Sequence, residues 1–286
     1  MNFLRPQIVF FIIFAAVFIF SPDYAPAAVI TGRASTVVEF DDAYDDTAVP
    51  IYQYLLVNIS DMDGNGLDFK GYGRLATDTQ DVIDADSRLY YAFIDKKDLF
   101  HNRLDARLGR QFIVSTAGAS IVDGLQLRVK DLGPLGFRIF GGGNATYYED
   151  YDADDLIWGA EINGRFGSSL DLALSFVQTY EDGDLAKELF GVDFNYDIQD
   201  FLNLYSEIQY NYLNDTFSYF LAGGHLYQNP RWDIRTEYLY SRPVFTATSN
   251  YSVFAVDEYE EIMAEYSYRI ALGLRAFSRF TWEMYD

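Results

Sequence analysis

The sequence predicts an all-β protein, a transmembrane, antiparallel, up-and-down β-barrel of which about 15 strands are present. Apolar and polar residues alternate with a period of two in segment after segment, which is typical of strands with one apolar and one polar face. These segments are about ten residues long, the length of a tilted membrane-spanning strand. Aromatic residues make up 18% of the chain and prolines number 7, a composition that favours strands over disorder.

Residues 156–180 show the pattern most clearly. In the first half, Trp158, Ile162 and Phe166 fall on one face, while Glu161 and Arg165 fall on the other. A turn at 167–169 follows, and the alternation then resumes. Two such segments, with apolar faces ending in aromatic residues, indicate a hairpin that crosses a membrane.

Fifteen segments of this kind follow one another along the chain. Segment 88–95 is expected to present Leu89, Tyr91 and Phe93 on its apolar face, and Arg110 interrupts the apolar face of segment 103–112 without an evident reason. The predicted strands are 32–40, 51–60, 67–77, 88–95, 103–112, 121–130, 137–145, 156–166, 170–180, 188–198, 201–212, 217–227, 232–240, 262–270 and 274–285.

The two ends of the chain suggest a signal peptide and a truncation. Residues 1–27 combine an early Arg5, an apolar run at 8–20 and an Ala25-x-Ala27 end, which predicts a secretory signal peptide. The alternative is a membrane anchor, for which the run is short. Residues 28–286 form the barrel. Because bacterial single-chain barrels close with an even number of strands, we expect a barrel of 16 or more strands that is incomplete at its C-terminus.

Acidic residues gather in one class of connection. If the first strand rises from the periplasm, alternate connections lie at the outer rim of the barrel. Six of them contain 22 acidic residues and no Lys or Arg, which equals the net charge of −22. They are 39–46, 78–86, 149–155, 181–184, 213–216 and 257–261. An acidic chain is repelled by phosphate, so nucleic acid is not an expected partner.

Residues suited to catalysis or to cofactor binding are scarce. The chain has no cysteine, which excludes disulfides, thiolate metal sites and covalent haem attachment. The acidic stretch 61–68 is better read as an Asn-Gly turn than as a calcium loop. His101 and His225 are the two histidines, and neither lies near an evident nucleophile. We therefore expect no catalytic, cofactor or metal residues, and no enzymatic activity.

Charged residues on the polar faces of the strands are the candidate pore-lining residues. In a barrel they point into the lumen, where water or cross-lumen pairing satisfies them. They indicate either a polar interior that avoids lipid or a channel with a modest anion bias behind an acidic mouth. They are Lys70, Arg74, Arg88, Arg103, Asp105, Arg107, Arg128, Lys130, Arg138, Glu161, Arg165, Asp171, Asp193, Asp233, Arg235, Glu237, Arg269, Arg275 and Arg279.

Several short motifs suggest a family. They are Gly-Tyr-Gly-Arg at 71–74, Leu-Gly-Arg-Gln-Phe at 108–112, Val-Asp-Gly-Leu-Gln-Leu at 122–127, Gly-Arg-Ala-Ser-Thr at 32–36 and the final 275–285. With these motifs the chain resembles the porin-like outer-membrane channel proteins of metal-reducing deltaproteobacteria. The resemblance implies a barrel that sheathes a multihaem c-type cytochrome, so that electrons cross the outer membrane. This chain ends earlier than members of that family. Because it cannot bind haem covalently, the cytochrome partner would carry the electrons.

The leading hypothesis is therefore a porin-like channel or scaffold in the outer membrane of a Gram-negative cell. Its expected partners are outer-membrane lipid and a multihaem cytochrome. A general or solute-selective diffusion porin is the first alternative. An outer-membrane enzyme that depends on His101 or His225, and a secreted soluble β-protein, are the others.

Overall fold

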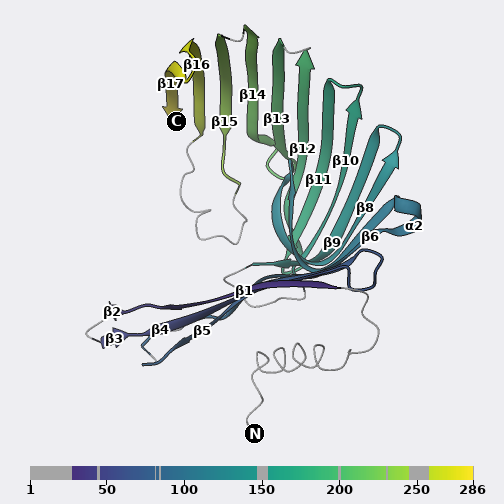
Figure 1. Ribbon diagram of the computed structural model, residues 1–286, viewed down its shortest axis with the longest axis vertical. Coiled ribbons are helices and arrows are strands. Elements are labelled where there is room, and N and C mark those ends of the chain that lie inside the picture. The colour runs from purple at the N-terminus through teal and green to yellow at the C-terminus, as the bar shows by residue number, and fades with distance from the viewer. Residues whose placement is uncertain are drawn as a thin grey trace. The chain divides into compact units, whose positions relative to one another are not determined.

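The computed structural model describes residues 28–43, 46–80, 82–83, 85–146, 154–198, 201–229, 231–244 and 258–285. Fifteen strands follow the order β1-β4-β5-β6 and then β7 to β17 in sequence (Figure 1), and β2 and β3 pair separately. Every pairing described between consecutive strands is antiparallel. The predicted all-β, up-and-down architecture is confirmed. The predicted signal peptide, residues 1–27, lies outside the described residues.

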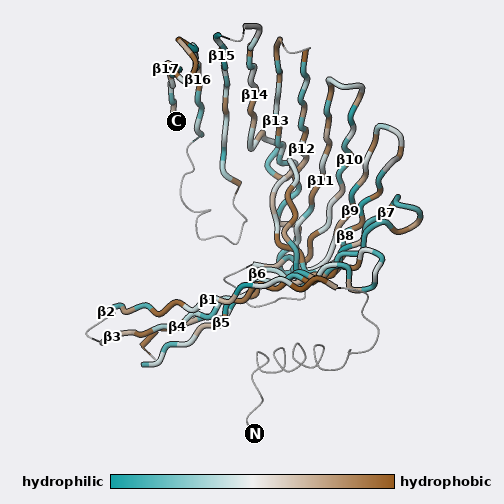
Figure 2. Tube along the Cα trace, in the orientation of Figure 1, coloured by the Kyte–Doolittle hydropathy of each residue, from teal (hydrophilic) through white to brown (hydrophobic). Residues whose placement is uncertain are grey.

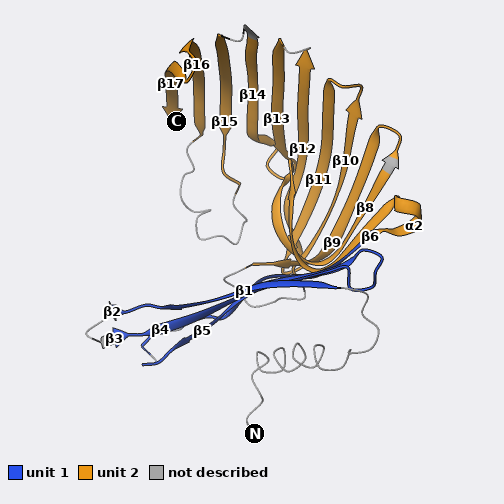
Figure 3. Cartoon of the chain, in the orientation of Figure 1, with its two compact units in different colours: residues 1–97 blue, residues 98–286 orange. Residues whose placement is uncertain are grey.

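The chain divides into two compact units, 1–97 and 98–286 (Figure 3). The strands of the first unit are β1 (Val29–Val38), β2 (Asp41–Ala43), β3 (Asp46–Ala48), β4 (Pro50–Ser60), β5 (Leu67–Asp78) and β6 (Arg88–Asp98). The second unit contains the short turn α2 (Leu99–Asn102), β7 (Leu104–Ser115), β8 (Gly118–Leu132), β9 (Leu135–Ala145), β10 (Leu156–Phe166), β11 (Leu170–Glu181), β12 (Asp184–Ile198), β13 (Leu202–Asn211), β14 (Thr216–Asn229), β15 (Trp232–Ser241), β16 (Tyr259–Ala271) and β17 (Leu274–Tyr285).

The predicted strands match the observed ones to within a few residues, and apolar and polar positions alternate along them (Figure 2). One predicted face is wrong. Tyr72 of β5 pairs with Tyr91, whereas the residue after Tyr72 pairs with Leu89, so Tyr90 is an extra residue in β6. Such a bulge reverses the alternation. Tyr91 and Phe93 therefore lie on the polar face of the sheet.

Three glycines form a crease in the second unit. Gly109, Gly124 and Gly142 occupy one hydrogen-bonded row across β7, β8 and β9. The backbones approach so closely that a Cβ on Gly124 would lie 2.1 Å from the carbonyl oxygen of Gly141. Gly109 has φ 124°, a conformation that suits glycine. The strands can therefore bend sharply at this row.

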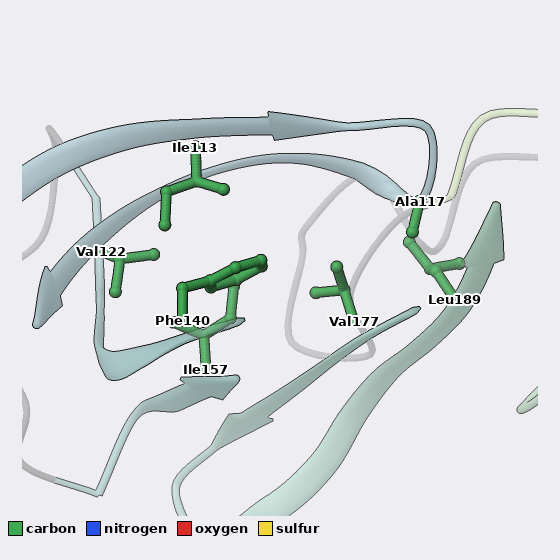
Figure 4. Packing of buried hydrophobic residues seen from close by; sticks show 7 residues of the cluster. All are labelled: Ile113, Ala117, Val122, Phe140, Ile157, Val177 and Leu189. Atoms are coloured by element: carbon green, nitrogen blue, oxygen red, sulfur yellow. The ribbon is translucent and has the colours of Figure 1, made fainter. Parts of the chain in front are cut away.

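Beyond the crease, the end of the β7–β8 hairpin packs against the polar face of the sheet. Its apolar contacts form a buried cluster (Figure 4). Ile113, Ala117 and Val122 come from the hairpin, and residues of β9 to β12 complete the cluster. These are Phe140, Ile157, Val177 and Leu189. The principal apolar core thus lies between the hairpin and the face that otherwise carries the charges.

Among the described residues, no helix has the length and apolar character needed to cross a bilayer.

Candidate functional site

The register places the predicted pore-lining residues of the second unit on one face of the sheet. Directly opposed residues share a face, and the rows connect them: Arg128 pairs with both Asp105 and Arg138, and Arg138 pairs with Glu161. The same face carries Arg107, Lys130, Arg165, Asp171, Asp193, Asp233, Arg235, Glu237, Arg269, Arg275 and Arg279. Arg103 lies in the turn before β7.

This polar face is the concave face of the second unit. The tip of the β7–β8 hairpin, residues 113–120, reaches across it to strands that are distant in the sheet order. The Ala117 N–H donates to Ser175 Oγ of β11 at 2.8 Å. Gln209 Nε2 of β13 donates to the Thr116 carbonyl oxygen at 3.2 Å. A sheet must curve for the turn between β7 and β8 to meet β13 in this way.

Two further features hold the hairpin tip in place. A Cβ on Gly191 would lie 2.4 Å from the Ala117 nitrogen, so the tip sits where β12 has no side chain. Arg138 Nη2 donates to the Val114 carbonyl oxygen at 2.7 Å and to Glu161 Oε2 at 2.5 Å. Since Ala117 is fully buried, the tip is packed against the wall and is not a free surface loop.

Two cavities lie on the concave face, and the tip lines the larger of them. The larger, about 1290 Å³, is lined by the tip and by polar-face residues of β10 to β15. The smaller, about 630 Å³, is lined by residues of β8 to β12 and by the turn at 133–134. Glu161, Asn163, Ala173 and Asp193 line both cavities. The two cavities therefore adjoin each other at these four residues of the concave face.

Most of the charged residues on the concave face are paired. The ion pairs are Lys130–Asp105 at 2.7 Å, Arg138–Glu161 at 2.5 Å, and Arg165–Asp171, Arg235–Glu237, Arg275–Asp233 and Arg279–Glu265 at 2.6 Å each. Pairs in contact with water contribute little to stability individually. Their main effect is to cancel much of the positive charge that the sequence places on this face.

The opposite, convex face explains Arg110. Arg110 of β7 lies directly opposite Asp123 of β8. Its Nε and Nη2 donate to the two carboxylate oxygens of Asp123 at 2.8 and 2.6 Å. This bidentate pair lies one residue beyond the Gly109–Gly124 step of the crease. It joins the two strands on the outside of the bend.

In the first unit, the predicted pore-lining residues Lys70, Arg74 and Arg88 lie on the polar face, which also carries a cluster of tyrosines. The rings of Tyr54 and Tyr90 stack on either side of Tyr72, at centroid distances of 6.4 and 4.8 Å. The guanidinium of Arg74 lies 4.8 Å from the centre of the Tyr52 ring, a cation–π contact. Lys70 and Arg88 share this face with Arg74.

The two histidines lie apart. His101 is in the turn α2, and His225 Nε2 lies 3.3 Å from Asp233 Oδ1. The same carboxylate group binds Arg275 through Oδ2 at 2.6 Å. Within the described ranges, no three or more His, Cys, Asp or Glu side chains are grouped so as to hold a metal ion.

The acidic stretch 61–66 forms the turn between β4 and β5, as predicted. Asp63 Oδ1 accepts hydrogen bonds from the backbone N–H groups of Asn65 and Leu67. The ammonium of Lys96 binds the other oxygen of Asp63 at 2.5 Å. The hydrogen bond from Lys96 lowers the pKa of the Asp63 carboxyl below its usual value. These carboxylates therefore stabilise the turn itself.

Sequence reasoning missed the hairpin tip. Residues 113–120 read Ile-Val-Ser-Thr-Ala-Gly-Ala-Ser and contain no charged residue. The other outer-rim connections are acidic, so this absence of charge was an available signal that the segment packs against protein. The inward fold itself depends on long-range contacts that alternation does not report.

Comparisons with known proteins agree with this architecture. The β-barrel porin OccK5 (OpdH) of Pseudomonas aeruginosa is 13% identical, with 90% of this chain and 80% of that chain covered and a TM-score of 0.51. OccK3 (OpdO) of the same organism is 15% identical, with 89% of this chain and 78% of that chain covered and a TM-score of 0.49. An anion-selective porin from Comamonas acidovorans is 11% identical, with 91% of this chain and 90% of that chain covered and a TM-score of 0.47. No family model and no curated protein matches the chain. The likeness to OccK5 shows that this chain has the fold of a β-barrel porin.

Proposed function

We propose that the protein is a porin-like channel of the Gram-negative outer membrane, in which the β7–β8 hairpin tip narrows a polar lumen. The observation that carries this proposal is the position of the tip on the charged concave face, where Ala117 binds Ser175. A soluble β-sheet protein would bury its apolar face instead. Here the buried apolar cluster lies on the charged face, beneath the hairpin.

The convex face supports a membrane location. Large apolar side chains are exposed on it along successive strands, among them Leu108, Leu125, Trp158, Ile162 and Leu174. An apolar surface that continues over so many strands is unusual for a protein in water. Outer-membrane lipid is the partner that covers such a surface in β-barrels.

The finer hypothesis is that the barrel sheathes a multihaem cytochrome. It rests on the resemblance in short sequence motifs. The hairpin tip lies on the concave face, where a protein partner inside the barrel would have to fit. A channel for small solutes needs no such space, so the geometry favours a general or solute-selective diffusion porin over the sheath.

Conductance measurements test the channel proposal. The protein is extracted from outer membranes and inserted into planar bilayers, where it should form open channels. Deleting residues 114–119 should increase single-channel conductance, because the deletion removes the tip from the lumen. Replacing residues 212–215, an outer turn in the same unit, with Asn-Gly should leave conductance unchanged. A folded protein that fractionates without detergent and never conducts would refute the proposal.

Haem analysis tests the sheath. Gentle detergent extraction from native cells should yield a barrel with stoichiometric c-type haem if a cytochrome lies inside. A haem-free protein that conducts ions would leave the diffusion porin as the function.

A further inference from the structure

We propose that Asp193 and Glu207 are the specificity-determining residues of this channel and that they make it prefer cations. The inference rests on the proposed channel function and deepens it. Asp193 of β12 and Glu207 of β13 are directly opposed on the concave face. Like charges in directly opposed positions destabilise a sheet, and a cation close to the two carboxylates would relieve their repulsion.

The pair lies immediately past the hairpin tip. The tip contacts the wall at Ser175, Gly191 and Gln209, which occupy one hydrogen-bonded row. Asp193 lies two residues after Gly191 and Glu207 lies two residues before Gln209; because the strands are antiparallel, both are displaced in the same direction and lie on the same face. That spacing is about 7 Å. A solute that passes the tip along this wall next meets the two carboxylates.

Between β9 and β17, the row that contains the pair has no basic residue. From β9 to β17 the described register gives it nine members, which are Gly136, Asn163, Ala173, Asp193, Glu207, Leu221, Leu239, Glu261 and Glu283. Four of these are acidic. Within the described part of the chain, neither Asp193 nor Glu207 has a hydrogen-bond or ion-pair partner.

The nearest basic residues are already engaged. Arg138 binds Glu161 and the Val114 carbonyl, and Arg165 binds Asp171. Lys187 is on the same face of β12 as Asp193 but six residues away, a distance of about 20 Å along the strand. Arg128 is on β8, with three strands between it and β12. The charge of the pair is therefore not cancelled locally.

The cavities give an independent reason to place the pair on the path of a solute. Asp193 lines both the larger and the smaller cavity, and Glu207 lines the larger one together with Thr116 and Ala117 of the tip. Acidic side chains in the wall of a narrow pore concentrate cations and deplete anions. The pairing of the arginines thus reverses the anion bias that their number in the sequence suggests.

Reversal potentials in a KCl gradient across a planar bilayer test the inference. The unaltered protein should be more permeable to K⁺ than to Cl⁻. The double variant Asp193→Asn, Glu207→Gln should lower the permeability ratio of K⁺ to Cl⁻ by roughly fivefold, since each carboxylate acts over a few ångströms of partly screened water. Raising the salt concentration should reduce the difference between the two proteins.

A matched control removes the same amount of charge elsewhere. Asp182→Asn, Asp215→Asn neutralises two acidic residues in outer turns, where φ is positive and asparagine is tolerated. This variant should keep most of the selectivity. A conducting protein that prefers anions, or whose selectivity responds equally to both double variants, would overturn the inference. A folded protein that forms no channels would instead overturn the proposed function.

Discussion

Two hairpins of the second unit end at the same rim, but one tip is buried and the other is exposed. The β7–β8 hairpin turns at Thr116 and Ala117 and is buried against the concave face. The β11–β12 hairpin turns at Asp182 and Gly183, which are exposed. Both pairs of strands alternate apolar and polar residues. Alternation therefore determines which face a residue occupies, but it does not determine whether the hairpin continues straight or folds inward.

The same hydrogen-bonded row shows what makes the difference. In β7, β8 and β9 this row consists of Gly109, Gly124 and Gly142, whereas in β11 and β12 it consists of Thr179 and Lys187. The side chains of Thr179 and Lys187 keep β11 and β12 apart. The three glycines allow the backbones of β7, β8 and β9 to approach one another and bend. An uncharged tip can then be buried, which an acidic tip could not be without a large desolvation cost.

The largest expected effect comes from filling the crease. Gly124→Val should lower the free energy of unfolding by about 3 kcal/mol or prevent folding altogether, because the new Cβ meets backbone atoms that cannot move independently. Urea unfolding in detergent, followed by tryptophan fluorescence, measures the change.

Gly224→Ala is the matched control. Gly224 is also in a strand of this unit, but its Cβ would lie no closer than 3.4 Å to other heavy atoms. This variant should therefore change stability by less than about 1 kcal/mol. If both variants were equally stable, the glycine row would not be the cause of the bend.

Much of this structure could be predicted from the sequence, and the exceptions have a common cause. The strands and their polar faces follow from alternation, which is local. The crease does not, because its three glycines are 15 and 18 residues apart in the chain and become a row only once the register is known. Arg110 was an unexplained exception for the same reason, since its partner Asp123 lies on the next strand. Tyr91 was assigned to the wrong face because a bulge is invisible to a strict period of two.

The ion pair on the convex side of the bend should have the next largest effect. Arg110→Leu alone, or Asp123→Leu alone, should cost about 2 kcal/mol, because each leaves an unpaired charge on an apolar face. The double variant should be within about 1 kcal/mol of the unaltered protein. A double-mutant cycle of unfolding free energies in detergent measures the coupling.

The cycle also separates two roles of the pair. If the pair only cancels charge, the double variant retains the conductance of the unaltered protein. If the bidentate geometry is needed to hold the bend, the double variant is stable but conducts like the variant without residues 114–119. Additive costs of the two single variants would show that Arg110 and Asp123 do not interact.

The smallest expected effect is at the point where the tip meets the wall. Ser175→Ala removes the acceptor for the Ala117 N–H, which is buried, and a buried donor without a partner costs about 1 kcal/mol. The apolar cluster still holds the tip, so conductance should remain unchanged while stability falls. Ser206→Ala, on the opposite face of the sheet in β13, should leave both unchanged. An increase in conductance with Ser175→Ala would mean that this one hydrogen bond, and not the packing of Ile113 and Leu189, holds the hairpin tip against the concave face.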